Sequence, residues 1–147
     1  MSISPESSEG PGLIPQVIHK MEVGEEQVVP GYGHVPIYGL NKMYFDEMMR
    51  IMDVRGIGLE TIRERGFVAS VGEIHNKPLR DLKAGDWVTI ITDAKEGDTS
   101  IEFNQSMQVR EKPAGSNSLR VDFRSSRNRP IPLPDWIREG LRREVVD

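Results

Sequence analysis

The segment from about Leu40 to Arg55 constrains this chain most, because it predicts a long helix that is apolar around most of its circumference. Gly56 follows it and can supply the left-handed residue that ends a helix. At 100° per residue, one narrow arc is charged, and it consists of Lys42, Asp46, Arg50 and Asp53. Asn41 and Glu47 are polar exceptions inside the apolar arc. A helix with so little polar surface needs other structure around it.

The rest of the chain predicts a sheet that can supply this cover. After the helix, apolar and polar residues alternate, and short turns at Gly97-Asp98 and Pro113-Ala114-Gly115 separate the alternating segments. Short connections favour antiparallel neighbours. The expected strands are 13–29, 67–76, 87–93, 100–110 and 119–124, followed by a short helix from Pro134. A sheet and an apolar helix bury each other best when the sheet curls around the helix, which predicts an α+β fold.

Size and composition narrow the class of protein. The 147 residues suit one domain, with 1–12 expected as a flexible tail rich in Ser, Glu, Gly and Pro, and 13–147 as the domain itself. The absence of cysteine excludes disulfides, thiolate metal sites and a cysteine nucleophile. A net charge of −4 argues against non-specific nucleic-acid binding. Because the sequence has no long apolar run and no basic-then-apolar leader, we expect a soluble, cytoplasmic protein with no membrane partner.

Four short motifs, in this order along the chain, resemble the hot-dog fold, in particular the 4-hydroxybenzoyl-CoA thioesterase-like acyl-CoA thioesterases. They are Gly33-His34-Val35, Tyr44-Phe45-Asp46-Glu47, Lys77-Pro78-Leu79 and Ala84-Gly85-Asp86-Trp87-Val88. The likeness runs from about residue 21 to residue 141. It implies a curved antiparallel sheet wrapped around a long central helix, and a homodimer or a dimer of dimers (a homotetramer) with sites at the subunit interface. It also implies coenzyme A or an acyl carrier protein as part of the substrate, with no separate cofactor.

The chain departs from this family at a position that carries chemistry. Many members have an Asp-x-Asp-x-x-Gly-(His or Val)-Val signature whose second Asp acts as base or nucleophile. The corresponding Asp positions here are Val28 and Pro30, which have no titratable group, and Pro36-Ile37 replaces the Asn that often follows His-Val. A thioesterase built on this sequence therefore uses another group.

Glu47 is the first candidate for that group. Other hot-dog thioesterases place a carboxylate on the central helix and polarise the thioester with a backbone N–H at the helix start, which implies Glu47 with Gly39 or Leu40. Within the apolar arc, loss of water around Glu47 would favour acid–base chemistry. Eight helical residues span about 12 Å, so Gly39 and Glu47 of one chain cannot easily serve one carbonyl, whereas a two-fold dimer can pair them across its interface. The alternative is that Glu47 lies at the helix edge or pairs with a group across a subunit contact.

The breaker-rich segment 30–39 supplies a second candidate. His34 could protonate a leaving thiolate or polarise a carbonyl, or it could be a loop histidine that bonds to backbone. Gly33 and Gly39 would let backbone N–H groups approach an oxyanion, although glycines also simply permit turns. Asn41 could orient a carbonyl or a water, or act as a local cap in the first helical turn.

Substrate-binding residues are expected within this segment and after it. Tyr32, Tyr38 and Met43 are candidates to contact the acyl part, with methionines otherwise expected to fill a core. Arg124 and Arg127 could hold the phosphates of coenzyme A, or they could simply face water. His19 and His75 have no second ligand at a metal-binding spacing, so no metal site is predicted.

The leading hypothesis is an acyl thioesterase that hydrolyses an acyl-CoA or acyl-carrier-protein thioester. A hydratase, dehydratase or lyase that acts on acyl thioesters is an alternative, since His34 with Glu47 or Asp46 could approximate a carboxylate–histidine pair. A module that binds an acyl group without chemistry is the non-enzymatic alternative, and the missing family Asp is its main support.

Overall fold

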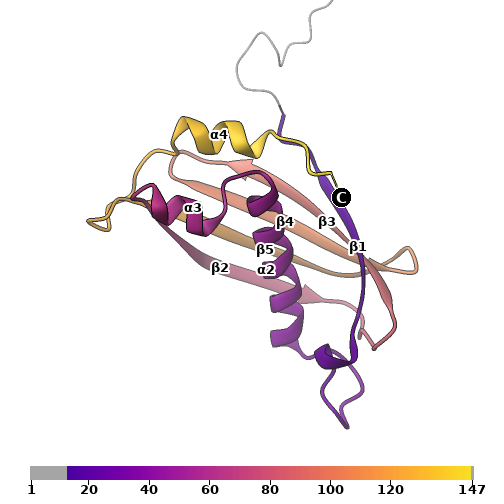
Figure 1. Cartoon of the computed structure of the whole chain (residues 1–147). Coiled ribbons are helices and arrows are strands. Elements are labelled where there is room, and N and C mark those ends of the chain that lie inside the picture. Colours follow the sequence, from indigo (N-terminus) through magenta and orange to yellow (C-terminus); the bar gives the residue numbers. More distant parts are fainter. Residues whose placement is uncertain (1–12, 147) are drawn as a thin grey trace, which may run out of the picture.

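The computed structural model describes residues 13–146, and the tail expected at 1–12 lies outside this part. Five antiparallel strands form one sheet in the order β1-β3-β4-β5-β2 (Figure 1). Their bounds are Val17–Glu22 (β1), Val68–Pro78 (β2), Trp87–Glu96 (β3), Ser100–Val109 (β4) and Lys112–Arg124 (β5). β1 precedes the long helix in the chain, whereas the other four strands follow it. β1 pairs with β3 and so forms one edge of the sheet.

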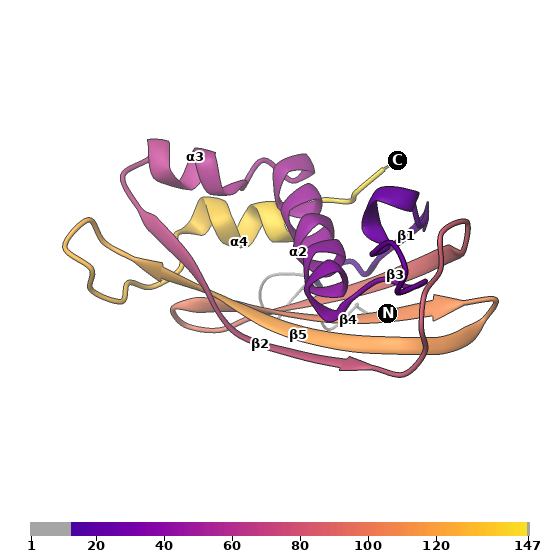
Figure 2. The same cartoon turned by 90° about the horizontal axis from the view of Figure 1, so that it is seen from below.

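All helices lie on one side of this curved sheet (Figure 2). The long helix is α2 (Ile37–Val54), and the shorter elements are η1 (Glu25–Gln27), α3 (Leu59–Glu64) and α4 (Asp135–Leu141). The α+β fold expected from the sequence, a curved antiparallel sheet packed on one long helix, is confirmed. None of the helices within residues 13–146 combines the length and apolar character that crossing a bilayer requires.

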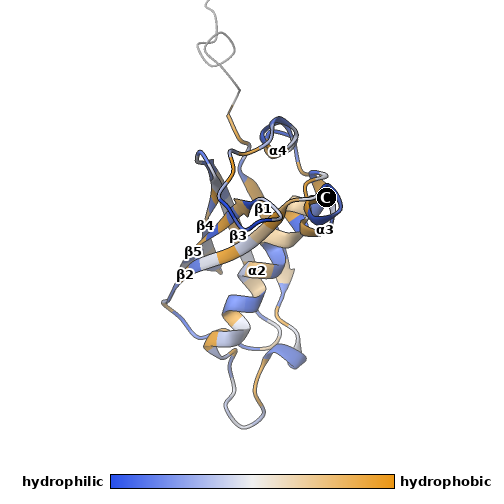
Figure 3. Cartoon of the chain, turned by 90° about the vertical axis from the view of Figure 1, so that its left-hand side faces the viewer, coloured by the Kyte–Doolittle hydropathy of each residue, from blue (hydrophilic) through white to orange (hydrophobic). Residues whose placement is uncertain are grey.

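Two apolar clusters join α2 to the sheet. One gathers around Met48 and Met52 with Phe103 and Phe123, and the other around Leu40 and Met43. The strands supply alternate residues to these clusters, and Figure 3 shows apolar and polar residues interleaved along the elements. Burying a large apolar side chain contributes about 1.5–3 kcal/mol, so the period-two pattern decides which sheet face turns inward.

The sheet wraps α2 only in part. Phe45 and Met49 are half-buried, while Tyr38 and Val54 are exposed, although the sequence predicts an apolar arc that includes Phe45 and Val54. One side of α2 therefore keeps apolar surface in contact with water.

Several local expectations need correction. The helix begins at Ile37 rather than Leu40 because Pro36 is its N-cap, and the first strand covers only 17–22 of the expected 13–29. The predicted turn at 113–115 lies inside β5 instead. Arg110 and Glu111 form that turn, with φ of 52° and 62°, although neither is glycine. The sequence analysis also missed α3.

A buried arginine joins both ends of the domain to α2. Arg55, at the C-cap of α2, is 1% exposed, and burial lowers its pKa. Its guanidinium donates to the carbonyl oxygens of Pro15 and Arg143, each at 2.9 Å. These two hydrogen bonds stabilise the buried guanidinium, and they also give each carbonyl oxygen a donor that water would otherwise supply.

A carboxylate on β3 anchors α4 in a way that makes stability depend on pH. Burial by itself would raise the pKa of Glu96, but hydrogen bonds and charges from Arg142 and Arg138 outweigh it and hold that pKa below the ordinary carboxyl value. A carboxyl with a lowered folded-state pKa stabilises the fold above its unfolded pKa, and this contribution disappears as pH falls through the folded pKa.

We therefore expect Glu96→Gln to lower the urea midpoint of unfolding at pH 7, and the gap from the wild type to narrow as pH falls from 5 to 3. Glu22→Gln on β1 is the control, because Glu22 is exposed and should change little. A gap of constant size across this pH range would contradict the linkage of Glu96 to α4.

Candidate active site at the start of the central helix

The segment before α2 folds into a tight turn that brings two aromatic rings together. Gly31 and Gly33 have φ of 82° and 83°, a region that glycine occupies readily, and the N–H of Tyr32 donates to the Val29 carbonyl at 3.0 Å. The ring centroids of Tyr32 and His34 lie 4.4 Å apart. The turn therefore holds both rings beside the first turn of α2.

A cavity of about 520 Å³ opens at this point. It combines side chains of the turn and of the start of α2 with those of the segment that follows β2. Its lining consists of Val29, Tyr32, His34, Val35, Pro36, Ile37, Tyr38, Leu40, Pro78, Arg80 and Asp81. Its volume suits a small acyl group, since ligand cavities of proteins typically measure about 300–1,000 Å³.

The free N–H groups of the helix start differ from those that the sequence suggested. Gly39 and Leu40 both donate to the Pro36 carbonyl, at 2.9 and 3.0 Å, so neither N–H is free for an oxyanion. Within residues 13–146, the N–H groups of Ile37 and Tyr38 have no hydrogen-bond acceptor. Both residues line the cavity, and unpaired N–H groups at a helix start favour negative charge.

Gly39 has a packing role instead. A Cβ at this position would lie 2.8 Å from Cγ1 of Val35, which is closer than carbon atoms approach. Because Val35 is itself buried, this glycine lets the turn and the first turn of α2 pack together.

His34 and Asp81 face each other across the cavity. The distance from His34 Nε2 to Asp81 Oδ1 is 3.9 Å. The imidazole is 29% exposed and the carboxylate 72% exposed, so both can meet a ligand. The sequence analysis included His34 but not Asp81.

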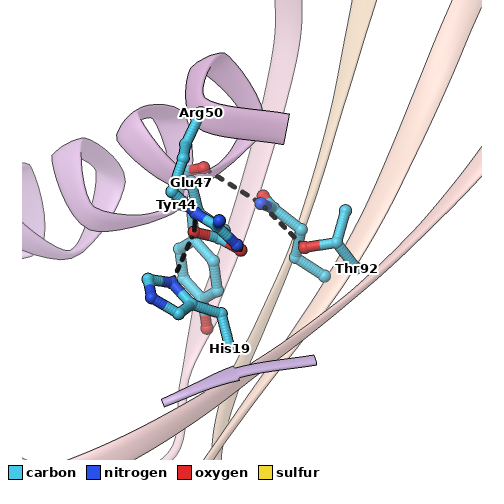
Figure 4. A network of polar contacts seen from close by, with 6 residues as sticks. His19, Tyr44, Glu47, Arg50 and Thr92 are labelled. Carbon is cyan, nitrogen blue, oxygen red and sulfur yellow. Dashed lines mark hydrogen bonds and ion pairs between the residues drawn. The ribbon is translucent and has the colours of Figure 1, made fainter. Parts of the chain in front are cut away.

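Glu47 lies in a different place, on the side of α2 that faces β1 (Figure 4). Its side chain is 1% exposed. Arg50 donates to both carboxylate oxygens at 2.9 Å, and His19 Nδ1 lies 2.8 Å from Oε1. Glu47 does not line the cavity, and both of its carboxylate oxygens bond to Arg50, whose positive charge balances that of the carboxylate. Glu47 thus pairs within its own chain, and neither a helix-edge position nor a pair across a subunit contact, the alternatives expected from the sequence, describes its surroundings in the described residues.

Three further candidates are also separated from the cavity. Met43 is 3% exposed and belongs to the core, and Asn41 Oδ1 accepts a hydrogen bond from Asn76 Nδ2 at 2.8 Å. Arg124 pairs in register with Val68, at the opposite end of β2 from Pro78. β2 is eleven residues long, so Arg124 and the cavity of one chain are about 30 Å apart.

Of the nine predicted site residues, His34, Tyr32 and Tyr38 meet at the cavity. His19 and Asp81 are the residues that sequence reasoning missed. His19 lies two residues from both Val17 and Met21, so the three side chains share the inner face of β1. This period-two pattern could have placed His19 on the side of the strand that faces the helix. Asp81 carries no such signal, because it lies between β2 and β3 with no periodic pattern.

Comparison with known proteins rests on structure alone. No protein-family model and no curated relative matches the sequence. The 1,4-dihydroxy-2-naphthoyl-CoA thioesterase from Synechocystis aligns with a TM-score of 0.79 at 11% identity, over 86% of this chain and 96% of that one. A hypothetical protein from Staphylococcus aureus in complex with CoA aligns with a TM-score of 0.76 at 14% identity, over 95% of this chain and 92% of that one. A gentisyl-coenzyme A thioesterase aligns with a TM-score of 0.71 at 14% identity, over 85% of this chain and 99% of that one. At these identities a likeness establishes the fold and nothing finer, and this chain therefore has the hot-dog fold that its motifs resemble.

Proposed function

We propose that this chain hydrolyses an acyl thioester of coenzyme A at the cavity beside the start of α2. The observation that supports this most is that Ile37 and Tyr38, whose N–H groups have no hydrogen-bond acceptor within residues 13–146, line the same cavity as His34. Thioester hydrolysis needs donors for the developing oxyanion and a group that moves a proton within reach of the same carbonyl. The likeness to CoA thioesterases agrees with this chemistry.

In the proposed reaction, the thioester oxygen lies against the N–H groups of Ile37 and Tyr38. Neutral His34 takes a proton from water while the water oxygen bonds to the carbonyl carbon, and the carbonyl electron pair moves to oxygen. When that pair returns, the C–S bond breaks and its electrons stay on sulfur. His34 then gives its proton to the thiolate, so one thioester and one water yield one acid and one thiol.

We also propose that two copies pair along β2. This strand is at the end of the sheet, and its outer side has no partner strand within the described chain. Val68 and Ile74 on it are 45% and 46% exposed, and Leu79 beside the cavity is 67% exposed. Unpaired edges with apolar residues favour pairing with another strand. A two-fold axis across β2 makes the strands antiparallel, so Val68 of one copy would lie beside Pro78 of the other.

This pairing would bring Arg124 and Arg127 of the partner subunit to the cavity, where they could bind the phosphates of coenzyme A. We expect Arg124→Ser/Arg127→Ser to raise KM for an acyl-CoA about tenfold, the effect of losing about 1.4 kcal/mol of binding. KM for the matching acyl-pantetheine, which lacks the nucleotide, should not change. Lys20→Ser on the opposite edge of the sheet is the control. Equal effects on both substrates would contradict phosphate binding by these arginines.

A panel of acyl-CoA and acyl-carrier-protein thioesters, with aliphatic, hydroxyaryl and enoyl members, tests the function directly. Release of free thiol is followed, and products are identified by mass. We expect free acid from at least one acyl-CoA. A hydroxyacyl-CoA from an enoyl-CoA would favour the hydratase alternative, which the missing family Asp keeps open. Tight binding of acyl-CoA without turnover would favour a binding module.

A further inference from the structure

We propose that Asp81 positions His34 for the reaction, in a chain that has Pro30 where the family signature places its acidic base or nucleophile. The inference rests on the proposed function and names the carboxylate of the same site. It is carried by three observations: the approach of the two side chains, the hydrogen bond that joins their loops, and the other groups that line the cavity.

The first observation is the approach of the two side chains. Asp81 Oδ1 lies 3.9 Å from His34 Nε2, and both side chains line the cavity. This distance is longer than a hydrogen bond, but such bonds in ligand-free enzymes are commonly long and shorten when substrate binds. A carboxylate that accepts the Nε2 proton leaves the basic electron pair on Nδ1 and stabilises the imidazolium that forms during the reaction.

The second observation is that the two loops are joined beside this pair. The N–H of Val35, next to His34, donates to the carbonyl of Leu82, next to Asp81, at 2.9 Å. Val35 and Leu82 are 3% and 1% exposed, so this hydrogen bond lies in the core. It holds the backbones on either side of the cavity in one arrangement, and only the side chains of His34 and Asp81 need to rotate.

The third observation concerns the other charged group in the lining. Arg80 precedes Asp81, but its Nε donates to the Pro113 carbonyl at 2.9 Å, which turns the side chain toward β5. Asp81 is the only acidic residue among the described residues that line the cavity. Glu47 is on the side of α2 that faces β1 and bonds to Arg50.

The test compares Asp81→Asn, Asp81→Glu and the control Asp46→Asn on the substrate that the wild type hydrolyses best. Asp46 is exposed on α2 and bonds to Lys42 at 2.6 Å, so its variant makes the same charge change away from the cavity. We expect Asp81→Asn to lower kcat about 10- to 100-fold with KM unchanged, because it removes positioning and not binding. Asp81→Glu should keep most of the activity, because its longer side chain can bridge the gap.

Thermal unfolding separates this role from a structural one. Asp81 is 72% exposed, so all three variants should unfold within a few degrees of the wild type. Full activity of Asp81→Asn, or equal loss in Asp81→Asn and Asp81→Glu, would overturn the assignment while leaving the thioesterase proposal in place. A wild type that hydrolyses no member of the panel would overturn the proposed function itself, and the role of Asp81 with it.

Discussion

Replacing His34 by Gln is expected to lower kcat on the best acyl-CoA substrate by about 10²- to 10⁴-fold, the range that a positioned proton-transfer group contributes. Glutamine keeps a polar side chain of similar length but cannot take a proton from water. KM should change little, because Tyr32, Ile37 and Tyr38, which line the cavity, are unchanged. Steady-state kinetics with a free-thiol readout measures both parameters.

His75→Gln is the matched control, since His75 is an exposed histidine on β2 outside the cavity lining. It should retain wild-type kcat. If His34→Gln hydrolyses the substrate as fast as the wild type, the imidazole has no part in the chemistry. The oxyanion donors would then be the only remaining part of the proposed mechanism.

Replacing Glu47 by Gln is expected to cost about 3 kcal/mol of unfolding free energy, the low end of the range for breaking a buried ion pair. The low end applies because Arg50 and His19 are 27% and 26% exposed and can regain contact with water. Urea unfolding measures the loss, and Asp46→Asn, the exposed neighbour on α2, should change stability by less than about 0.5 kcal/mol.

The same variant separates the two roles that have been considered for Glu47. With a structural ion pair, kcat per folded molecule of Glu47→Gln stays within a few fold of the wild type. Complete loss of hydrolysis with unchanged stability would instead return Glu47 to the mechanism, in the two-subunit arrangement that the sequence suggested. Measurements at low temperature, where the folded state dominates, keep the two readouts independent.

The fold was predictable because its signals are local. The apolar arc of α2 and the period-two pattern of β4 each reflect one face of one element turned to the core, and neighbouring residues alone reveal them. The errors occurred where tertiary contacts override local preference. The turn at Arg110-Glu111 has positive φ without glycine, because the pairing of β4 with β5 fixes the register there.

The site was predictable only in part, and for a related reason. His34, Tyr32 and Tyr38 are close in sequence, so a breaker-rich loop before a helix was enough to group them. Gly39 was chosen as an oxyanion donor from its position, but hydrogen bonds of the first helical turn decide which N–H groups lack an acceptor, and within residues 13–146 these belong to Ile37 and Tyr38.

By itself the sequence determined one long apolar helix, alternating strands, the absence of cysteine chemistry and a loop with His34 at the helix start. Only the tertiary structure decided which charged groups meet. Glu47 and Arg50 share one helix, but β1 brings His19 to that carboxylate, and the segment after β2 brings Asp81 to His34. Such pairs join residues that are far apart in the chain, and the physical reason is that electrostatic partners depend on distance in space, whereas periodicity reports only which face of an element is buried.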